Sequence, residues 1–256
     1  MRQSEMHFAR RRRSSLGLLL CAAVIGVTIP ACQTAKPIPR SERTGELSVR
    51  PGVNDKYREN DFDSWLDRFE VESREIYTER NRLVDDVGIR PGMVVADIGS
   101  GTGFYVMLFA KKASPGGKVI AVDIIPEFLE RIRQRADAEK LTNVETSLCD
   151  EDTIYLPPAS IDLAFICDTY HHFEYPMSTM TSLYVAMKPG GEVVLVDFIR
   201  DPESSDAWVL GHVRAGQEVV IKEVESAGFQ LVDKGGHIDY LKKNYVLRFR
   251  KAGETG

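Results

Sequence analysis

The chain has 256 residues, 43% of them hydrophobic, an ordinary composition for a globular domain with a sizeable core. Its formal net charge of −5 is unevenly spread: residues 1–31 hold five arginines and one acidic residue, so the remainder carries −9. This acidic body has no clustered basic face, which argues against binding DNA or RNA through phosphate neutralisation. A small-molecule or lipid-like substrate is easier to accommodate.

The first 31 residues have the order of regions found in a signal peptide. An arginine run, Arg10–Arg13, is followed by an apolar run and then by small residues before Cys32. The stretch Ile29–Cys32 resembles a bacterial lipobox, in which cleavage before the cysteine leaves Cys32 to carry lipid. An uncleaved signal anchor is the alternative. Both interpretations predict export to the periplasm or cell envelope and attachment to a bacterial membrane.

Residues 32–54 are predicted to form a flexible tether between this leader and the body. They contain prolines at positions 37, 39 and 51 and show little apolar periodicity. The rest of the chain, residues 55–256, is expected to form a single domain.

The body is predicted to be an α/β domain, because from Met93 onward short Val/Ile-rich runs alternate with longer amphipathic stretches. Five runs are expected to form mostly parallel strands: Met93–Ile98, Lys118–Asp123, Val144–Leu148, Ile161–Cys167 and Glu192–Phe198. Helices are expected at Phe104–Lys112, Pro126–Lys140, Pro176–Met187 and Ala215–Ala227, and on an earlier apolar stripe from Ile76 to Val87 that ends at Gly88. Two last runs, Phe229–Asp233 and Tyr245–Arg250, have no helix between them and should pair as an antiparallel hairpin.

A glycine-rich turn follows the first expected strand. Asp97 lies near the end of that strand, and the turn Gly99–Gly103 has glycine at every second position, so its backbone can approach a ligand beside a helix N-terminus. A dinucleotide fingerprint would require glycine where Phe104 stands, which disfavours a nicotinamide-dependent dehydrogenase. Twenty residues after the turn, Asp123 ends the second strand, where a carboxylate can accept hydrogen bonds from both ribose hydroxyls of a nucleoside.

The segment from about Glu72 to Lys251 resembles the class I S-adenosylmethionine-dependent methyltransferases, particularly the small-molecule group that includes quinone C-methyltransferases. The resemblance is carried by the glycine turn, Val119–Asp123, Asp150, Asp162–Phe165 and Lys188–Glu192. It implies a Rossmann-like seven-stranded sheet of order 3-2-1-4-5-7-6, with strand 7 antiparallel and helices on both faces. That order separates the strands that end near Cys149 and Cys167, so we expect two free thiols rather than a disulfide.

The resemblance also implies S-adenosylmethionine as the cofactor and methyl transfer to a small-molecule or lipid-like acceptor as the activity. Asp97 and the glycine-turn backbone would hold the methionine end, and Asp123 the ribose. Ile124, Asp150 and Glu151 would contact adenine. The full set of cofactor-binding candidates is Asp97, Gly99, Ser100, Gly101, Gly103, Asp123, Ile124, Asp150 and Glu151.

The loop after the fourth expected strand contains the candidate catalytic groups, Asp168 and His171. It lies at the carboxyl edge of the sheet, where open α/β sheets bind ligands. Either group could take a proton from the acceptor, while His171 or the adjacent His172 could instead contact the substrate or have no chemical role. The loop lacks the Asn/Asp-Pro-Pro-Tyr motif of nucleobase and glutamine N-methyltransferases, which makes those substrate classes less favoured.

No metal is expected, because His171, His172, His212 and Cys167 match no HxxxH or CxxC spacing. Some basic and aromatic residues are weaker site candidates. For the cofactor's carboxylate these are Arg74, Tyr77 and Arg80, and for the substrate His212 and Arg214.

A second class of function stays open. A non-catalytic module could keep this fold and bind a nucleoside-like ligand at the envelope, because S-adenosylmethionine is made in the cytoplasm whereas the N-terminus argues for export.

Overall fold

A computed structural model of the protein describes residues 45–59, 62–72, 74–235 and 238–253. The predicted leader (1–31), the lipid candidate Cys32 and the first part of the predicted tether lie outside these residues and stay predictions. Within the described part, every helix is too short or too polar to cross a membrane.

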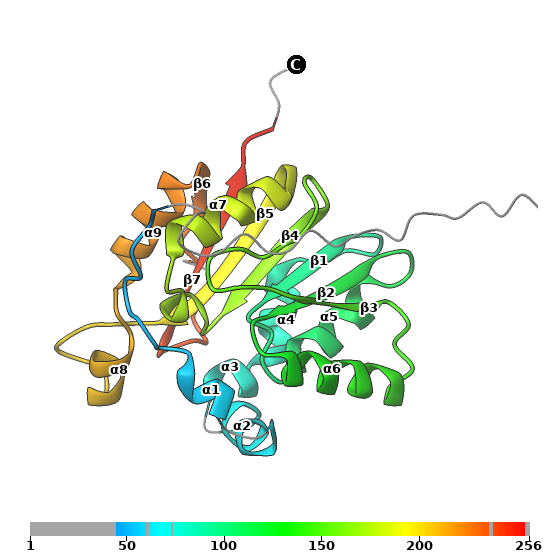
Figure 1. Ribbon diagram of the computed structural model, residues 1–256, viewed down its shortest axis with the longest axis horizontal. Helices are drawn as coiled ribbons and strands as arrows, with labels where there is room; N and C mark the ends of the chain where they lie inside the picture. The colour runs from blue at the N-terminus through cyan, green and yellow to red at the C-terminus, as the bar shows by residue number, and fades with distance from the viewer. Residues whose placement is uncertain (1–44, 60–61, 73, 236–237, 254–256) are drawn as a thin grey trace, which may run out of the picture. The chain divides into compact units, whose positions relative to one another are not determined.

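Seven strands form one sheet in the order β3-β2-β1-β4-β5-β7-β6 (Figure 1). β7 runs antiparallel to both of its neighbours, and the other pairs are parallel. The α/β class, the strand order and the antiparallel hairpin expected above are therefore confirmed. The strands are β1 (Val94–Ile98), β2 (Lys118–Asp123), β3 (Val144–Leu148), β4 (Ile161–Cys167), β5 (Met187–Phe198), β6 (Phe229–Asp233) and β7 (Asn244–Lys251).

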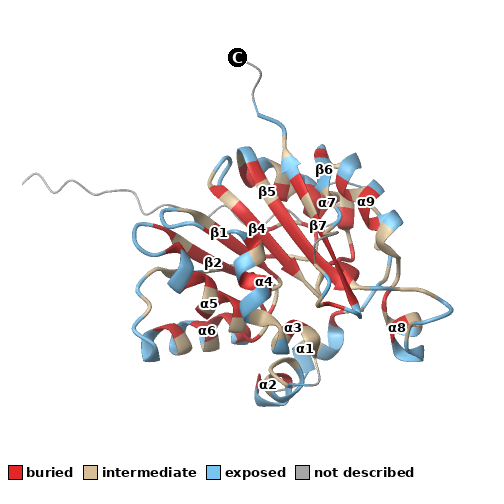
Figure 2. Ribbon diagram, turned by 180° about the vertical axis from the view of Figure 1, so that it is seen from behind, coloured by how far each residue is buried: buried red, intermediate tan, exposed pale blue. Residues whose placement is uncertain are grey.

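Both faces of the sheet are covered, which explains why its strands are apolar without a polar face. Successive residues of β1 enter different cores: Val95 packs with the helices α4 (Arg80–Val87), α5 (Phe104–Ala113) and α6 (Pro126–Ala138), while Ala96 and Ile98 pack with α7 (Pro176–Ala186) and α9 (Gln217–Ser226). Figure 2 shows the central strands as the most buried part of the fold.

The helices before the sheet differ from the sequence prediction. The expected stripe from Ile76 to Val87 is divided into α3 (Glu75–Thr78) and α4, because the backbone leaves helical geometry at Glu79 (φ −91°, ψ 10°). Gly88 adopts the left-handed conformation (φ 78°) expected of a C-terminal cap. Three short helices were not predicted: α1 (Asp55–Glu59), α2 (Phe62–Phe69) and α8 (Ala207–His212). In Figure 1, α1, α2 and α3 lie together at one end of the sheet.

The end of the predicted tether, residues 45–54, is held against the body by hydrogen bonds. The Glu46 carboxylate accepts hydrogen bonds from the backbone N–H groups of Met177 and Ser178, at 3.1 and 2.8 Å, and so caps the start of α7. The Val49 N–H donates to the Glu174 carbonyl at 2.8 Å. This segment therefore leads directly into α1 at the site described next.

Candidate active site

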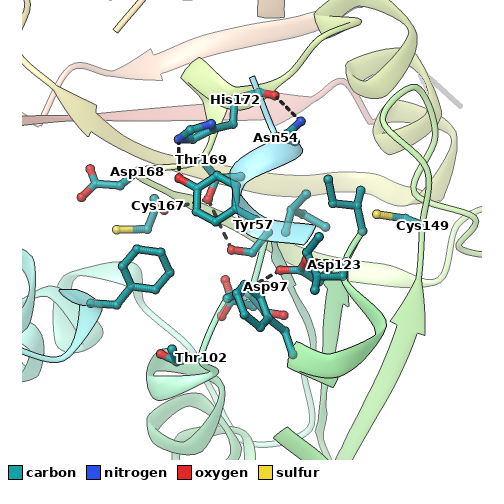
Figure 3. Close-up of a pocket in the computed structure, with 18 of the residues that line it drawn as sticks. Asn54, Tyr57, Asp97, Thr102, Asp123, Cys149, Cys167, Asp168, Thr169 and His172 are labelled. Atoms are coloured by element: carbon teal, nitrogen blue, oxygen red, sulfur yellow. Dashed lines mark hydrogen bonds between the residues drawn. The ribbon is translucent and has the colours of Figure 1, made fainter. Parts of the chain in front are cut away.

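A cavity lies at the carboxyl ends of β1, β2 and β4, as the sequence predicted. Its floor is the turn after β1, and its walls are the ends of β2 and β3 and the loop after β4. Residues before the sheet also line it, among them Asn54, Tyr57 and Phe69. Figure 3 shows Asn54 and Tyr57 in this lining. Eight of the nine cofactor-binding candidates line this cavity: Asp97, Gly99, Ser100, Gly101, Asp123, Ile124, Asp150 and Glu151.

The ninth candidate, Gly103, has a different role. It is the N-cap of α5 with φ 78°, and a Cβ atom added there would lie 2.4 Å from Cγ1 of Ile132 on α6. The absence of a side chain at Gly103 therefore allows α5 and α6 to pack closely. Gly103 is not among the residues that line the cavity.

The turn after β1 is held open by the carboxylate that ends β2. The backbone of Gly99 is left-handed (φ 70°), and a Cβ there would lie 2.1 Å from the Thr169 side chain. Asp123 accepts the Gly101 N–H on one oxygen and the Ile125 N–H on the other, each at 2.9 Å. Burial raises the pKa of Asp123 to about 6, although these hydrogen bonds oppose the rise. Asp123 thus fixes the shape of the turn and still has lone pairs available to a ligand.

Asp97 and Ser100 are polar groups left without partners at the base of the cavity. The Asp97 side chain has no hydrogen-bond partner among the residues that the structure describes, although Asp97 is only 4% exposed. Burial raises its pKa to about 8, with a further contribution from the charge of Asp123. The Ser100 hydroxyl is also buried and unpartnered in the described part of the chain. Buried polar groups normally have partners, so a ligand bearing an ammonium group fits this end.

The far end of the cavity suits an adenine ring. Ile124 packs against an apolar cluster of Phe62, Trp65, Ile125 and Phe128. Asp150 accepts a hydrogen bond from the Tyr155 hydroxyl at 2.8 Å, and Glu151 pairs with Arg58 at 2.7 Å. Apolar packing beside two carboxylates can hold a flat, amine-bearing ring by stacking and hydrogen bonding.

Asp168 lines the cavity, but both of its carboxylate oxygens are engaged. Arg74 donates to one at 2.5 Å, and the side-chain amide of Asn244 donates to the other at 2.6 Å. Burial raises the pKa of Asp168 to about 6, and the neighbouring charge of Arg74 opposes that rise. The pair brings Arg74 into the cavity lining, whereas Arg80 stacks on Tyr77 outside it. Only one of the three weaker candidates for the cofactor's carboxylate therefore reaches the site.

A second cavity, of about 630 Å³, adjoins the first. The two share Tyr57, Phe69, Arg74, Ile76, Asp168 and His172 in their linings. This volume falls in the usual range for small-molecule sites. The residues that line only the second cavity include aromatic and histidine side chains: Trp65, His171, Phe198, Trp208 and His212.

His171 is held rigidly by a residue that the sequence analysis missed. Its Nδ1 lies 2.7 Å from one oxygen of Asp197, and its backbone N–H donates to the other at 3.1 Å. Asp197 is 1% exposed and lies in β5. The only sequence signal for it was an acidic residue within the apolar run Val194–Phe198.

His172 and His212 are both at the boundary of the second cavity. The Nε2 atom of His172 is 3.0 Å from the Tyr57 hydroxyl (Figure 3). It is also 3.3 Å from Nε2 of His212. Burial, followed by the charge of His171, lowers the pKa of His172 far below its ordinary value and that of His212 to about 4. Arg214, the other weak candidate near here, pairs with Glu223 at 2.6 Å and lines neither cavity.

The two thiols lie apart, as expected. Cys149 follows β3 and Cys167 ends β4; β2 and β1 lie between these two strands, and both cysteines are free. Burial raises the pKa of each thiol well above its ordinary value, so neither is a nucleophile at neutral pH.

Residues 89–250 match a family model described as a methyltransferase domain. The chain belongs to this methyltransferase family. It is 31% identical over 183 residues to the ubiquinone/menaquinone biosynthesis C-methyltransferase UbiE of Bordetella parapertussis, covering 66% of this chain and 69% of the relative. A UbiE of Ralstonia pickettii is 33% identical over 116 residues, covering 45% of this chain and 47% of the relative.

Solved structures agree with the fold of this methyltransferase. A SAM-dependent methyltransferase from Aquifex aeolicus superposes with a TM-score of 0.65 at 23% identity, covering 75% of this chain and 98% of the other. Family and fold together make the protein an S-adenosylmethionine-dependent methyltransferase. The unpartnered Asp97 and Ser100 are where the structure fits that cofactor.

Proposed function

We propose that this methyltransferase methylates a ring carbon of a small phenolic or quinol-like acceptor bound in the second cavity. The observation that carries the proposal is the continuity of the two cavities, which share Tyr57, Asp168 and His172. A molecule in the second cavity therefore lies beside the cofactor site. The names of the relatives, which refer to ubiquinone and menaquinone biosynthesis, support an aromatic acceptor of this kind.

The residues of the first cavity would hold the cofactor in one orientation. Asp97 would pair with its ammonium group, Arg74 with its carboxylate, and Asp123 with its ribose hydroxyls. When bound, S-adenosylmethionine supplies an already activated methyl group on a sulfonium centre. What the protein must add is the position of the acceptor and the exclusion of water.

The aromatic side chains of the second cavity suit a flat acceptor. Trp208 and Phe198 lie edge to face with ring centroids 5.0 Å apart, and Trp65 and Phe69 form a second pair at 5.4 Å. Rings of this kind favour stacked or edge-on contacts with another aromatic ring. Lys56, Arg68 and Lys243 also line the cavity and could stabilise negative charge on an acceptor oxygen.

Carbon methylation of a phenol requires its ring to be electron-rich, which removal of the hydroxyl proton achieves. We place that hydroxyl beside the three histidines that line the second cavity, His171, His172 and His212. His171 is the best-oriented member, because Asp197 holds its Nδ1 and leaves Nε2 for other partners. Asp168 is held by Arg74 and Asn244, so we assign it to positioning rather than to accepting a proton.

The test uses the full chain purified in detergent. Calorimetry should show saturable binding of S-adenosylmethionine, and incubation with reduced benzoquinols and naphthoquinols should give a product heavier by one methylene group. Asp123→Asn should weaken this binding about 100-fold or more. Asp162→Asn, near the start of β4 and outside the cavity lining, should leave it unchanged. Cofactor binding with no methylated product from any such quinol would overturn the proposed acceptor class.

We propose in addition that the enzyme is exported and held at a bacterial membrane through lipid on Cys32. The support is the order of arginine, apolar and small residues before that cysteine. A membrane-borne quinol would then be accessible to it. Mass measurement of the N-terminus tests this, because lipid on Cys32 and retention of Met1 exclude one another.

A further inference from the structure

Three histidines converge at the back of the second cavity. One side-chain nitrogen from each of His171, His172 and His212 lies within 4.8 Å of the others. The first two belong to the single 3₁₀ turn Tyr170–His172, and the third ends α8, 40 residues further on. No local spacing in the sequence joins these residues, so no metal was predicted there, but the fold supplies the proximity that the spacing lacks.

The separation of two of these nitrogens matches that of ligands on one metal ion. Nε2 of His172 and Nε2 of His212 are 3.3 Å apart. Zinc–nitrogen bonds of about 2.0–2.1 Å in a tetrahedron place ligand nitrogens about 3.3–3.4 Å apart. Without a cation, two imidazole nitrogens at this distance need a proton between them, and Nε2 of His172 is also within 3.0 Å of the Tyr57 hydroxyl, a contact that a bound ion would replace. A cation can instead accept the lone pairs of both.

His171 has the carboxylate partner behind the ligand nitrogen that metal-binding histidines usually have. Asp197 receives hydrogen bonds from Nδ1 and from the backbone N–H of His171, so only Nε2 is available as a ligand. Carboxylate–histidine pairs of this kind fix the tautomer and the ring orientation at metal sites, and they make the other nitrogen a better donor.

We propose that His171, His172 and His212 bind one divalent transition-metal ion, with zinc as the best fit, through their Nε2 atoms. Three neutral imidazoles without a thiolate suit zinc, copper, nickel or cobalt better than magnesium or calcium. Other nearby donors are engaged or excluded: both oxygens of Asp168 are hydrogen-bonded, and the Cys167 thiol does not belong to the cluster. Three protein ligands leave a fourth position open toward the second cavity, as in catalytic zinc sites.

The role of this metal site rests on the proposed function, whereas its existence does not. The oxygen of a phenolic acceptor would occupy the open position as an oxyanion. With the ion bound, Nε2 of His171 is a ligand and no longer takes the proton, so the ion replaces His171 in that role. The O–H bond breaks as the oxygen–metal bond forms, and the proton leaves to solvent. No electron transfer is needed, because the ion acts only as a Lewis acid. The acceptor class is thereby narrowed to compounds with an ionisable hydroxyl beside the methylated carbon.

The metal is tested directly on the full chain after treatment with a chelator and dialysis. Titration with Co²⁺ should show one ion bound per chain, with the visible absorption of a four-coordinate site, and Zn²⁺ should displace it. His212→Ala should abolish the absorption, and Asp197→Asn should weaken affinity about 10- to 100-fold through the lost outer partner. The matched control is Asp162→Asn. Asp162 lies at the far end of β4 from the histidines and pairs with Lys188, so this change should leave the affinity for Co²⁺ unchanged.

Calorimetry of S-adenosylmethionine binding in the presence of chelator checks that each variant is folded. Absence of saturable Co²⁺ and Zn²⁺ binding by the native chain overturns the site, as does full binding by His212→Ala. One bound ion with no methylation of any quinol keeps the site and overturns the proposed function. Full methylation in chelator overturns the role of the metal and keeps the proposed function.

Discussion

The cofactor side and the acceptor side of the site are built in different ways. The cofactor side comes from two consecutive strand–turn–helix units: Asp97 and the glycine turn after β1, and Asp123 at the end of β2. The acceptor side is assembled from segments far apart in the chain. Tyr57 comes from α1, His172 from the loop after β4, and His212 from α8.

The two sides also differ in how their polar groups are satisfied. On the cofactor side, Asp97 is buried without a partner in the described part of the chain, so the side is prepared for a charged ligand. On the acceptor side, Asp168 and His171 are already held by Arg74 and Asp197. The first side therefore holds a protonated carboxyl until an ammonium-bearing ligand replaces the proton, whereas the second is preorganised by the protein itself. Substitutions should separate the two.

The largest effect is expected from Asp123→Asn. The change removes a charge and one of the two acceptors that bind the backbone at Gly101 and Ile125, and it weakens the contact with ribose. Loss of one or two charge-assisted hydrogen bonds should reduce S-adenosylmethionine affinity about 100-fold or more, measured by calorimetry. Co²⁺ binding on the acceptor side should be unchanged. Equal losses of S-adenosylmethionine affinity and Co²⁺ affinity would mean that the variant unfolds. The two sides could then not be distinguished by this substitution.

Next in size is the pH dependence set by Asp97. Because its pKa in the free protein is about 8, a cofactor with an ammonium group must displace a proton from this carboxyl at neutral pH. Affinity should therefore rise by up to about tenfold per pH unit between about pH 6 and pH 7.5, with proton release detectable from the buffer dependence of the binding enthalpy. Asp97→Asn should bind more weakly and remove this slope.

The same carboxyl should lower the stability of the cofactor-free protein. Its pKa is raised on folding from 3.8 to about 8, so stability is lost as the pH rises through that interval. Asp97→Asn should therefore raise the Tm at pH 8.5 by several degrees when no cofactor is present, measured by differential scanning calorimetry. An unchanged or lower Tm would contradict the raised pKa of Asp97 in the folded protein.

The contrast between the two sides also explains what could be predicted from sequence. Asp97, the glycine turn and Asp123 are close in the sequence, and strand ends of a parallel sheet meet at one edge, so their proximity followed from the pattern. His212 reaches His172 only through α8, a short helix with no periodic signal. Asp197 is a polar residue within an apolar strand, where sequence gives no indication of its partner. Gly103 fits the glycine spacing but acts in helix packing, which depends on Ile132 of another helix.

A smaller effect is expected from Trp208→Ala on the acceptor side. Trp208 is 52% exposed, lines only the second cavity and packs edge to face on Phe198. Removing one partly exposed aromatic contact should raise the KM for a quinol acceptor about five- to tenfold, equivalent to about 1–1.4 kcal/mol, and leave cofactor affinity unchanged. The exposed Val232, which lines neither cavity, provides the control variant Val232→Ala. An altered cofactor affinity in Trp208→Ala would contradict the independence of the cofactor side from the acceptor side.

The smallest effect should follow Glu46→Gln, in the segment that leads into α1. Glu46 caps α7 through the N–H groups of Met177 and Ser178, and loss of its charge should cost about 1 kcal/mol of unfolding free energy, measured by urea denaturation. Arg50 of the same segment donates to the carbonyl of His212, so loosening the segment should also raise the acceptor KM slightly. Cofactor affinity should stay constant, because no hydrogen bond of Glu46 reaches the glycine turn in the described part of the chain. A change in cofactor affinity larger than the change in KM would show that the N-terminal segment stabilises the cofactor side instead.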